Sequence, residues 1–387
     1  MCTSTTHGRC ATTFPNRCGA VAEPEAPQVT RSARRAQLIG TGLIGGSVGL
    51  VLKAQGWHVT GFDADESAAS LAIELGAIDE IGLDLNAEVC FVALPVGSVA
   101  AAANRLLDMP GTNWVVTDVG SVKAPIAAAV AHPRFVGGHP MAGSEVEGVA
   151  GSRADMFDGA VWVLTPSEQT DPLAHVLVHS IVAGFGAEVL TLAPELHDRI
   201  VALVSHVPHL TAVTLMGLAS SRAQAQDHQA LLRLAAGGFR DMTRIAGGHP
   251  AIWPDICAEN RDAILEILDA FMIELGEVRT IVANGDRPEL MDRLERSREA
   301  RINLPTTAGP PSELVELLVT VKDRPGELAR ITAMATEMQV NIYDIEIAHS
   351  AERPSGLVIM LVDLEKAQPM VDELLADGYS VAQRRLG

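Results

Sequence analysis

The sequence predicts an α/β fold: a Rossmann-type doubly wound parallel sheet, then an all-helical domain, then a small ferredoxin-like βαββαβ domain. Three observations lead to this order. Residues 36–193 alternate apolar strands with helical segments, residues 195–301 show long helical periods, and residues beyond 313 return to strands separated by helices. With 387 residues, 48% hydrophobic and 20% charged, the chain is long enough for two or three domains with their own cores.

Residues 1–34 are expected to form a disordered extension. They are rich in Ser, Thr, Ala and Pro and lack the apolar core of a secretory signal. Cys2, Cys10 and Cys18 lie here without a histidine pattern that would favour a metal site, whereas Cys90 and Cys257 are interpreted as core residues. This cysteine usage is typical of a reducing compartment, so we expect a cytoplasmic protein.

The dinucleotide-binding domain is predicted over residues 35–193. Its strands are continuous apolar runs, as expected for a parallel sheet covered by helices on both faces. Helices follow the first two strands, over residues 43–55 and 66–75. The predicted strands are Ala36–Gly40, His58–Asp63, Val89–Leu94, Trp114–Asp118, Val161–Thr165 and Glu188–Leu192.

The turn after the first strand has the spacing of a dinucleotide-binding loop. Gly40, Gly42 and Gly45 form a GxGxxG pattern, and Leu43 and Ile44 open the helix that follows. The first glycine permits a tight turn, the second lets a pyrophosphate approach the backbone, and the third packs the helix on the strand. The alternative interpretation is a sharp strand–helix turn that binds no ligand.

The end of the second strand predicts which dinucleotide is bound. Asp63 stands where a carboxylate would bind the ribose hydroxyls. It is followed by Ala64, Asp65 and Glu66, with no arginine to meet a 2′-phosphate. The pattern therefore favours NAD over NADP.

A glycine- and proline-bounded loop about 100 residues after this turn contains His139 and, six residues on, Glu145. A histidine beside a nicotinamide would accept the proton of an alcohol whose carbon gives up hydride. An isolated histidine is more often a buried, hydrogen-bonded loop residue, but this position at the expected strand edge favours catalysis. Glu145 is expected either to orient the histidine or simply to be solvated.

Ser121 follows the strand that ends at Asp118, again at the carboxyl edge of the sheet where ligands bind in such folds. Two interpretations remain open. Its hydroxyl caps the next helix, or it hydrogen-bonds the substrate or His139.

The helical domain is predicted over residues 194–302, and it contains three further histidines. His206 and His209 are three residues apart and share a helix face, and Pro208 is expected to kink the helix. His197 falls about 180° away on an ideal helix, so a three-histidine zinc site is disfavoured. Hydrogen bonding of the substrate by His206 or His209 is the preferred interpretation.

Positive charge is concentrated further along this domain. Arg244 is suited to holding a carboxylate bidentately, with Asp241 three residues earlier to steady it. The alternative is an exposed arginine on a solvated helix face. Trp253 either walls the pocket or fills the core.

Residues 303–312, with three prolines and a glycine, form a predicted linker, and residues 313–387 the last domain. The formal net charge of −19 argues against nucleic acid or an anionic membrane as the main partner. No apolar run of the sequence approaches the ~20 residues of a membrane span.

In their order along residues 36–300, several runs resemble the prephenate dehydrogenases of tyrosine biosynthesis. They are GTGLIGGS from Gly40, DVGSVK from Asp118, GHPMAGSE from Gly138, LHDRIVALVSHVPH from Leu196 and FRDMTRIA from Phe239. The C-terminal part resembles an ACT domain, an amino-acid sensor, through VKDRPGEL from Val321 and VNI from Val340.

The resemblance implies NAD-dependent oxidative decarboxylation of prephenate to 4-hydroxyphenylpyruvate and CO2 by a homodimer. It implies that His139 takes the ring hydroxyl proton, that Ser121 contacts the substrate, and that Arg244 binds a substrate carboxylate. His206, His209 and Trp253 would complete the pocket. In the ACT-like domain, Asp323, Gly326 and Asn341 lie where the family's ligand loops lie, which implies tyrosine as a feedback effector.

Three rival functions remain open. Arogenate dehydrogenase is the same chemistry on the transaminated substrate, whose ammonium Glu145 would pair with. A catalytically silent sensor of NAD and amino acids is a second. A β-hydroxyacid dehydrogenase is a third, although such enzymes usually use a lysine of the helical domain and residues 124–321 contain none.

Overall fold

The computed structural model describes residues 33–144, 146–225, 235, 237–248, 250–303, 313–322, 324–349 and 355–385. Glu145 and Asp323, two of the predicted site residues, lie outside the described residues. So does nearly all of the predicted N-terminal extension and most of the predicted linker.

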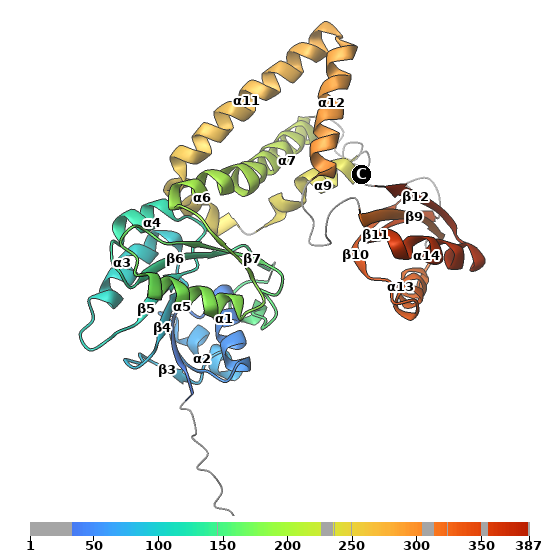
Figure 1. Cartoon of the computed structure of the whole chain (residues 1–387). Coiled ribbons are helices and arrows are strands. Elements are labelled where there is room, and N and C mark those ends of the chain that lie inside the picture. The colour runs from blue at the N-terminus through green and yellow to red at the C-terminus, as the bar shows by residue number, and fades with distance from the viewer. Residues whose placement is uncertain are drawn as a thin grey trace, which may run out of the picture. The chain divides into compact units, whose positions relative to one another are not determined.

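An eight-stranded sheet forms the first domain, and its order confirms the Rossmann-type prediction (Figure 1). The strands lie in the order β3-β2-β1-β4-β5-β6-β7-β8, which reverses direction between β1 and β4. Ligands bind outside the carboxyl ends of the strands at such a reversal. The strands are β1 Arg35–Ile39, β2 His58–Phe62, β3 Glu80–Ile81, β4 Val89–Val92, β5 Val115–Asp118, β6 Phe135–Pro140, β7 Val161–Thr165 and β8 Glu188–Thr191.

The strand β6 corrects the prediction of a loop around His139. His139 lies inside this fully buried strand and pairs with Val163 of β7. The pair is antiparallel, so the sheet is mixed rather than wholly parallel. Gly137 and Gly138 suggested a loop, but the crowding of β6 requires them: a Cβ on Gly138 would lie 2.6 Å from the Asp118 carbonyl oxygen.

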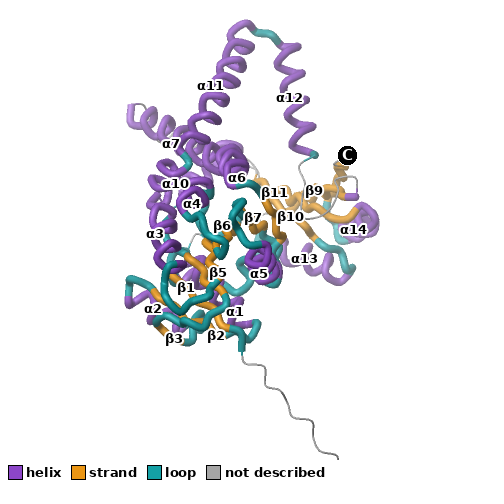
Figure 2. Tube along the Cα trace, turned by 60° about the vertical axis from the view of Figure 1, so that its left-hand side comes forward, coloured by secondary structure: helices purple, strands orange, loops and turns teal. Residues whose placement is uncertain are grey.

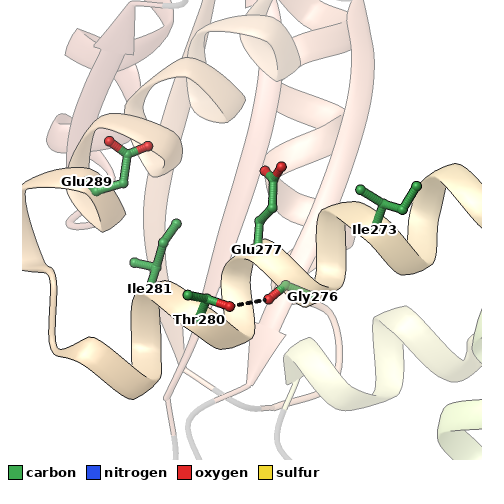
Figure 3. A pocket seen from close by; sticks show the side chains of 6 residues that line it. All are labelled: Ile273, Gly276, Glu277, Thr280, Ile281 and Glu289. Carbon is green, nitrogen blue, oxygen red and sulfur yellow. Dashed lines mark hydrogen bonds between the residues drawn. The ribbon is translucent and has the colours of Figure 1, made fainter.

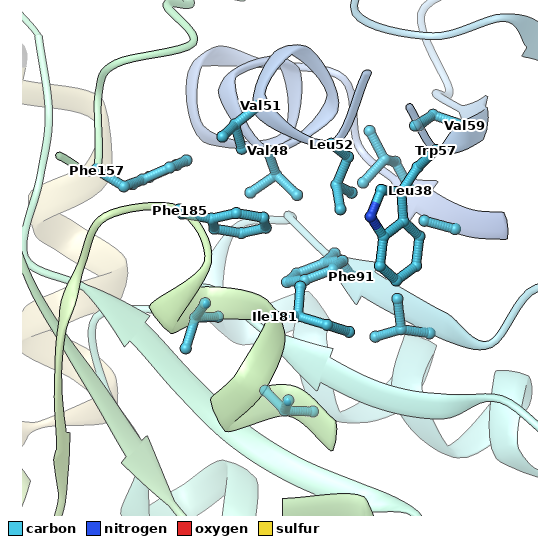
Figure 4. Packing of buried hydrophobic residues seen from close by; sticks show 14 of the residues in the cluster. Leu38, Val48, Val51, Leu52, Trp57, Val59, Phe91, Phe157, Ile181 and Phe185 are labelled. Atoms are coloured by element: carbon cyan, nitrogen blue, oxygen red, sulfur yellow. The ribbon is translucent and has the colours of Figure 1, made fainter. Parts of the chain in front are cut away.

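Helices cover both faces of this sheet. Helices α1 Leu43–Ala54, α2 Glu66–Glu74 and α5 Pro172–Ala183 pack on one face, and α3 Val96–Leu107 and α4 Ala124–Ala129 on the other. Beneath α1, the rings of Phe91, Phe157 and Phe185 meet, with Phe185 centred 6.2 Å from Phe91 and 5.9 Å from Phe157 (Figure 4). This packing fixes α1, and with it the glycine turn, against the sheet.

The second region is helical, as predicted, and is dominated by two long antiparallel helices, α11 and α12 (Figure 2). Gly285 ends α11 in the left-handed conformation and Asp286 caps α12. The helices are α6 Pro194–Val201, α7 Val207–Ala225, α9 Gly237–Thr243, α10 Trp253–Glu259, α11 Arg261–Asn284 and α12 Arg287–Ile302, with 3-10 turns at Arg244–Gly247 and Pro250–Ile252.

A π-helical turn, Ala202–His206, joins α6 to α7. Pro208 explains it, because its ring lacks an N–H and would clash with the carbonyl of Val204 in a regular α-helix. The predicted disturbance therefore falls in the turn before the proline.

The continuous helix Pro194–Arg222 that results contains an 18-residue window with a mean hydropathy of 1.5 and is, among the described residues, the one helix long and apolar enough by composition to cross a membrane. The sequence had suggested no membrane span, because no unbroken apolar run approaches ~20 residues. A third of that window, 33%, is buried, and the buried side chains of the helix include His197, Asp198, His206 and His209, polar groups that lipid would leave without water.

A hollow of about 470 Å³ lies between α11 and α12 (Figure 3). The Thr280 hydroxyl donates to the Gly276 carbonyl at 3.0 Å, so it is satisfied within its own helix. No predicted site residue lines this hollow. Its lining is Ile273, Gly276, Glu277, Thr280, Ile281 and Glu289.

The C-terminal region has the predicted element order βαββαβ. Its antiparallel sheet has the order β10-β11-β9-β12, and its buried core includes Leu317 of β9, Ile331 of α13, Met360 of β11 and Met370 of α14. The elements are β9 Leu314–Lys322, α13 Glu327–Glu337, β10 Ile342–His349, β11 Ser355–Asp363, α14 Leu364–Ala376 and β12 Ser380–Arg385.

Candidate active site

The glycine turn is shaped by its close contacts and leaves one side open. Gly40 has φ +93°, and a Cβ there would lie 2.2 Å from the Ala93 carbonyl oxygen. A Cβ on Gly45 would lie 2.0 Å from the Gly40 carbonyl oxygen. A Cβ on Gly42 would meet nothing within 4 Å. Gly40 and Gly45 therefore serve the fold, whereas Gly42 faces open space into which a ligand can approach.

The start of α1 is suited to an anion. Gly42 caps this helix without any side-chain hydrogen bond to the first-turn amides. The N–H groups of Leu43, Ile44 and Gly45 have no partner within the helix, as in the first turn of any α-helix. An open helix N-terminus of this kind fits a pyrophosphate.

Asp63 fixes the turn from the end of β2. Its Oδ2 accepts hydrogen bonds from the Thr41 amide at 2.7 Å and the Thr41 hydroxyl at 3.1 Å, and its Oδ1 accepts one from the Asp65 amide at 3.0 Å. The predicted ribose-binding carboxylate thus also holds the glycine turn in place.

His139 lies near the carboxyl end of β6, at the same edge of the sheet as the glycine turn. Its side chain is 9% exposed. Its Nδ1 lies 2.8 Å from Nε2 of His197, and Nδ1 of His197 lies 2.8 Å from Oδ1 of Asp198. A hydrogen-bonded chain therefore runs from β6 to α6, the first helix of the helical region.

The surroundings of His139 favour its neutral form. Burial lowers its pKa well below the ordinary value, and the neighbouring His197, Lys123 and His206 lower it further. A neutral imidazole is the form that can accept a proton.

Lys123 and Asp118 fix the backbone just before His139. The buried Lys123 ammonium donates to an Asp118 carboxylate oxygen and, at 2.7 Å, to the Gly138 carbonyl. The other Asp118 oxygen accepts from the Gly138 amide at 3.1 Å. Both the N–H and the C=O group of Gly138 are hydrogen-bonded, so the position of the next residue, His139, is tightly constrained.

The predicted pocket residues His206, His209 and Trp253 meet. The His209 ring stacks on the Trp253 ring with centroids 3.6 Å apart, and the His206 ring meets the same indole edge-on at 6.1 Å. Burial lowers the pKa of His206 to about 4 and also lowers that of His209. These two imidazoles are therefore neutral near pH 7.

The angular argument that set His197 apart from His206 assumed an ideal α-helix, and the helix between them is not ideal. The Asn260 amide donates to the Asp198 carbonyl at 2.9 Å and lies 3.1 Å from Nδ1 of His206, so both histidines border the same buried region. The π-helical turn between them adds a residue, and an ideal α-helical count does not apply.

Arg244 is exposed at the start of a 3-10 turn that packs beside His209; a Cβ on Gly248 would lie 3.9 Å from that ring. Within the described residues, the predicted ion pair between Asp241 and Arg244 is not formed. Arg244 is thus exposed and is not steadied by this carboxylate.

Among the described residues, Ser121 makes neither of the two hydrogen bonds expected for it within the chain, the cap of the next helix and the bond to His139. In the described part of the chain, His139 is bonded to His197 and not to Ser121. Helix α4 is capped instead by Asp198, whose oxygens each accept at 2.8 Å from the amides of Lys123 and Ala124. A contact between Ser121 and substrate stays a prediction.

The sequence prediction missed four residues of the site: His197, Asp198, Lys123 and Asn260. Two signals were present: the adjacent His-Asp pair, and a lysine in an apolar segment that proves completely buried. Their roles depend on contacts between segments far apart in the chain.

Comparison with known proteins identifies the family to which this chain belongs. The model of the prephenate dehydrogenase nucleotide-binding domain matches residues 48–191, and that of the prephenate dehydrogenase dimerization domain matches residues 193–296. The chain belongs to the prephenate dehydrogenase family. Both matched segments contain residues of the site: His139 lies in the first, and His197, His206 and Arg244 lie in the second.

Individual relatives have different names within this family. The prephenate dehydrogenase of Bacillus subtilis is 33% identical over 83% of this chain and 90% of its own. A structure of A. aeolicus prephenate dehydrogenase with hydroxyphenyl propionate and NAD+ is 30% identical with a TM-score of 0.65, covering 70% of this chain and 99% of that one. A Synechocystis arogenate dehydrogenase structure, also 30% identical, has a TM-score of 0.60 over 69% and 98%.

Proposed function

We propose that this protein oxidises and decarboxylates prephenate to 4-hydroxyphenylpyruvate and CO2 with NAD as the hydride acceptor. The observation that carries the proposal is His139, buried and neutral at the carboxyl edge of the nucleotide-binding sheet in a chain of this family. Such an imidazole is suited to take the proton of a substrate hydroxyl while the carbon below it loses hydride.

The cofactor is NAD. The open amides at the start of α1 and the space beside Gly42 fit its pyrophosphate, and Asp63 fits its ribose. When bound, NAD+ supplies the acceptor for the hydride that leaves the ring carbon bearing the hydroxyl.

The residues of the chain would manage protons and orientation. His139 takes the hydroxyl proton as the C–H bond breaks. Loss of the ring carboxylate as CO2 then makes the ring aromatic, and the proton returns from His139 to the phenolate oxygen. Arg244 pairs with a substrate carboxylate, Ser121 contacts the substrate, and His206, His209 and Trp253 complete the pocket.

The test is a kinetic assay with the purified full chain. We expect NADH to form with prephenate, together with CO2 and 4-hydroxyphenylpyruvate, and we expect a lower KM for NAD+ than for NADP+. No NADH with any substrate would leave the silent sensor as the better interpretation.

Arogenate is the second candidate substrate, because a solved relative is an arogenate dehydrogenase of the same identity to this chain. Both reactions use the same ring chemistry and differ only at the side chain, where arogenate has an ammonium group. Comparing kcat/KM for the two substrates distinguishes them, and Glu145 is the residue to exchange for Gln.

A homodimer fits the exposed apolar residues of the helical region. Phe271, Met272, Ile273 and Leu275 on α11 are 39–65% exposed in the single chain. Such a patch is typical of a subunit interface. Sedimentation of the full chain as a dimer is the expected result, in a soluble and, as the cysteines indicate, cytoplasmic enzyme.

We also infer an ACT-type ferredoxin-like sensor domain that binds tyrosine between two copies. Gly326, with φ +95°, precedes α13 and Asn341 follows it. The 11 residues of α13 separate them by about 16 Å. One chain therefore cannot bring both to one ligand, whereas a pair of domains can. Tyrosine should inhibit the dimer and raise its melting temperature; phenylalanine and tryptophan are the controls.

A further inference from the structure

A hydrogen-bonded chain, His139–His197–Asp198, was not predicted from the sequence. It connects a strand of the nucleotide-binding domain to the first helix of the helical region through two 2.8 Å contacts. His197 is 1% exposed and Asp198 is 4% exposed, so water does not compete for these bonds.

The bonding pattern of Asp198 indicates which nitrogen of a neutral His197 ring carries the proton. The carboxylate accepts from the Lys123 amide and the His197 ring at Oδ1, and from the Ala124 amide at Oδ2. A carboxylate with N–H groups on both oxygens can only accept, so the proton of neutral His197 lies on its Nδ1. Its Nε2 is then an acceptor.

The tautomer of His139 follows from this. Because Nε2 of His197 accepts, Nδ1 of His139 must carry the proton that joins them. The remaining nitrogen of His139, Nε2, has a free lone pair. This is the tautomer that a base needs if the substrate hydroxyl approaches Nε2.

The same chain stabilises the product of proton transfer. When Nε2 of His139 accepts a proton, the imidazolium stays bonded to His197, which is bonded to the Asp198 carboxylate. The negative charge at the end of the chain offsets the burial cost of the new positive charge.

The His197–Asp198 pair is itself held rigidly. The Asp198 carboxylate caps α4 through the amides of Lys123 and Ala124, and the Asp198 carbonyl accepts from Asn260 at 2.9 Å. Elements of both domains therefore fix its orientation before substrate arrives.

We propose that His197 and Asp198 are positioning residues that hold His139 in the Nδ1-protonated tautomer, leaving Nε2 free to act as the base. This inference rests on the proposed function for its kinetic consequence. Its structural part, the tautomer, does not.

The test variant is Asp198→Asn. An amide in this position has a single acceptor oxygen for three N–H donors, so one orientation places its NH2 toward His197 and reverses both imidazole tautomers. We expect kcat with prephenate to fall by on the order of 10²-fold, with KM and the Kd of NAD unchanged. His179→Asn, on the exposed face of α5, is the matched histidine control and should retain wild-type kcat.

The pH profile separates positioning from general damage. Loss of the Asp198 charge should lower the pKa of His139 further, moving the acid limb of kcat/KM to lower pH. A lower kcat with an unmoved limb would indicate a merely structural role and overturn the proposal.

Nitrogen-15 NMR of labelled histidine in the enzyme without substrate reads the tautomer directly. We expect unprotonated Nε2 at His139 in the wild type and protonated Nε2 in the variant; protonated Nε2 in the wild type would refute the proposal. If Asp198→Asn fails to fold, His197→Gln keeps the α4 cap and carries the same test. Wild type without NADH formation would instead refute the proposed function.

Discussion

Acid should destabilise this protein through His206. Its side chain is 2% exposed, and its Nδ1 accepts a hydrogen bond from the Asn260 amide at 3.1 Å. Both features favour the neutral ring, and burial lowers its pKa from 6.5 to about 4. The unfolded chain, in contrast, takes up this proton near pH 6.5.

The direction and the size of the change in the free energy of unfolding follow from these two pKa values. Between pH 6.5 and 4 the unfolded state binds more protons at His206 than the folded state does. The folded state therefore keeps its full stability above pH 6.5 and loses part of it as the pH falls through this window. A shift of this size corresponds to about 3 kcal/mol when titration is complete. Between pH 7 and pH 5, His206 alone should lower the free energy of unfolding by about 2 kcal/mol.

Urea denaturation at pH 7 and pH 5 measures this loss. His206→Asn keeps an oxygen to accept from Asn260 but cannot be protonated, so its loss between the two pH values should be smaller by about 2 kcal/mol. His179→Asn, which removes an exposed histidine, should behave as wild type. Equal losses in wild type and His206→Asn would refute the assignment of a low pKa to His206.

Three further predictions concern the site. His139→Asn should lower kcat by about 10²–10⁴-fold while NAD still binds; turnover above about half of wild type would rule out the base. Arg244→Gln should raise KM for prephenate by roughly 10–100-fold with little change in NAD affinity, and equal effects on both would argue against a carboxylate contact. Gly42→Ala should fold normally but raise the Kd of NAD at least about tenfold, whereas Gly40→Ala should lower the melting temperature, since its φ alone costs about 1–3 kcal/mol. Calorimetry and NAD titration check this pair, and unimpaired NAD binding by Gly42→Ala would contradict the pyrophosphate position.

The site draws its groups from both family domains. His139 and its Lys123–Asp118 support belong to the nucleotide-binding domain, and His197 belongs to the helical region. Buried polar groups of the helical region, His197 and Asp198 among them, hold the His139 imidazole in place from the other side of the junction between the two domains.

The element order and the glycine turn could be predicted from the sequence because their signals are local. Apolar runs, helical periods and the spacing of Gly40, Gly42 and Gly45 each depend on a few neighbouring residues. The βαββαβ order of the last region was predicted for the same reason.

The strand around His139 could not be predicted, because its glycines normally indicate a loop. They are required by the crowding of β6 against Asp118 and Thr165, residues from other strands. Likewise, an ideal helix count placed His197 on the face opposite His206, but the π-helical turn Ala202–His206 lies between them and changes that angle.

By itself, the sequence determined the fold class, the nucleotide-binding turn and His139 as the candidate base, since each is encoded by residue type and short spacing. The tertiary structure alone decided the partner of that base. His197 stands 58 positions from His139, and the 2.8 Å contact between them exists only because β6 and α6 pack together. A tautomer depends on such a contact, and no local pattern encodes it.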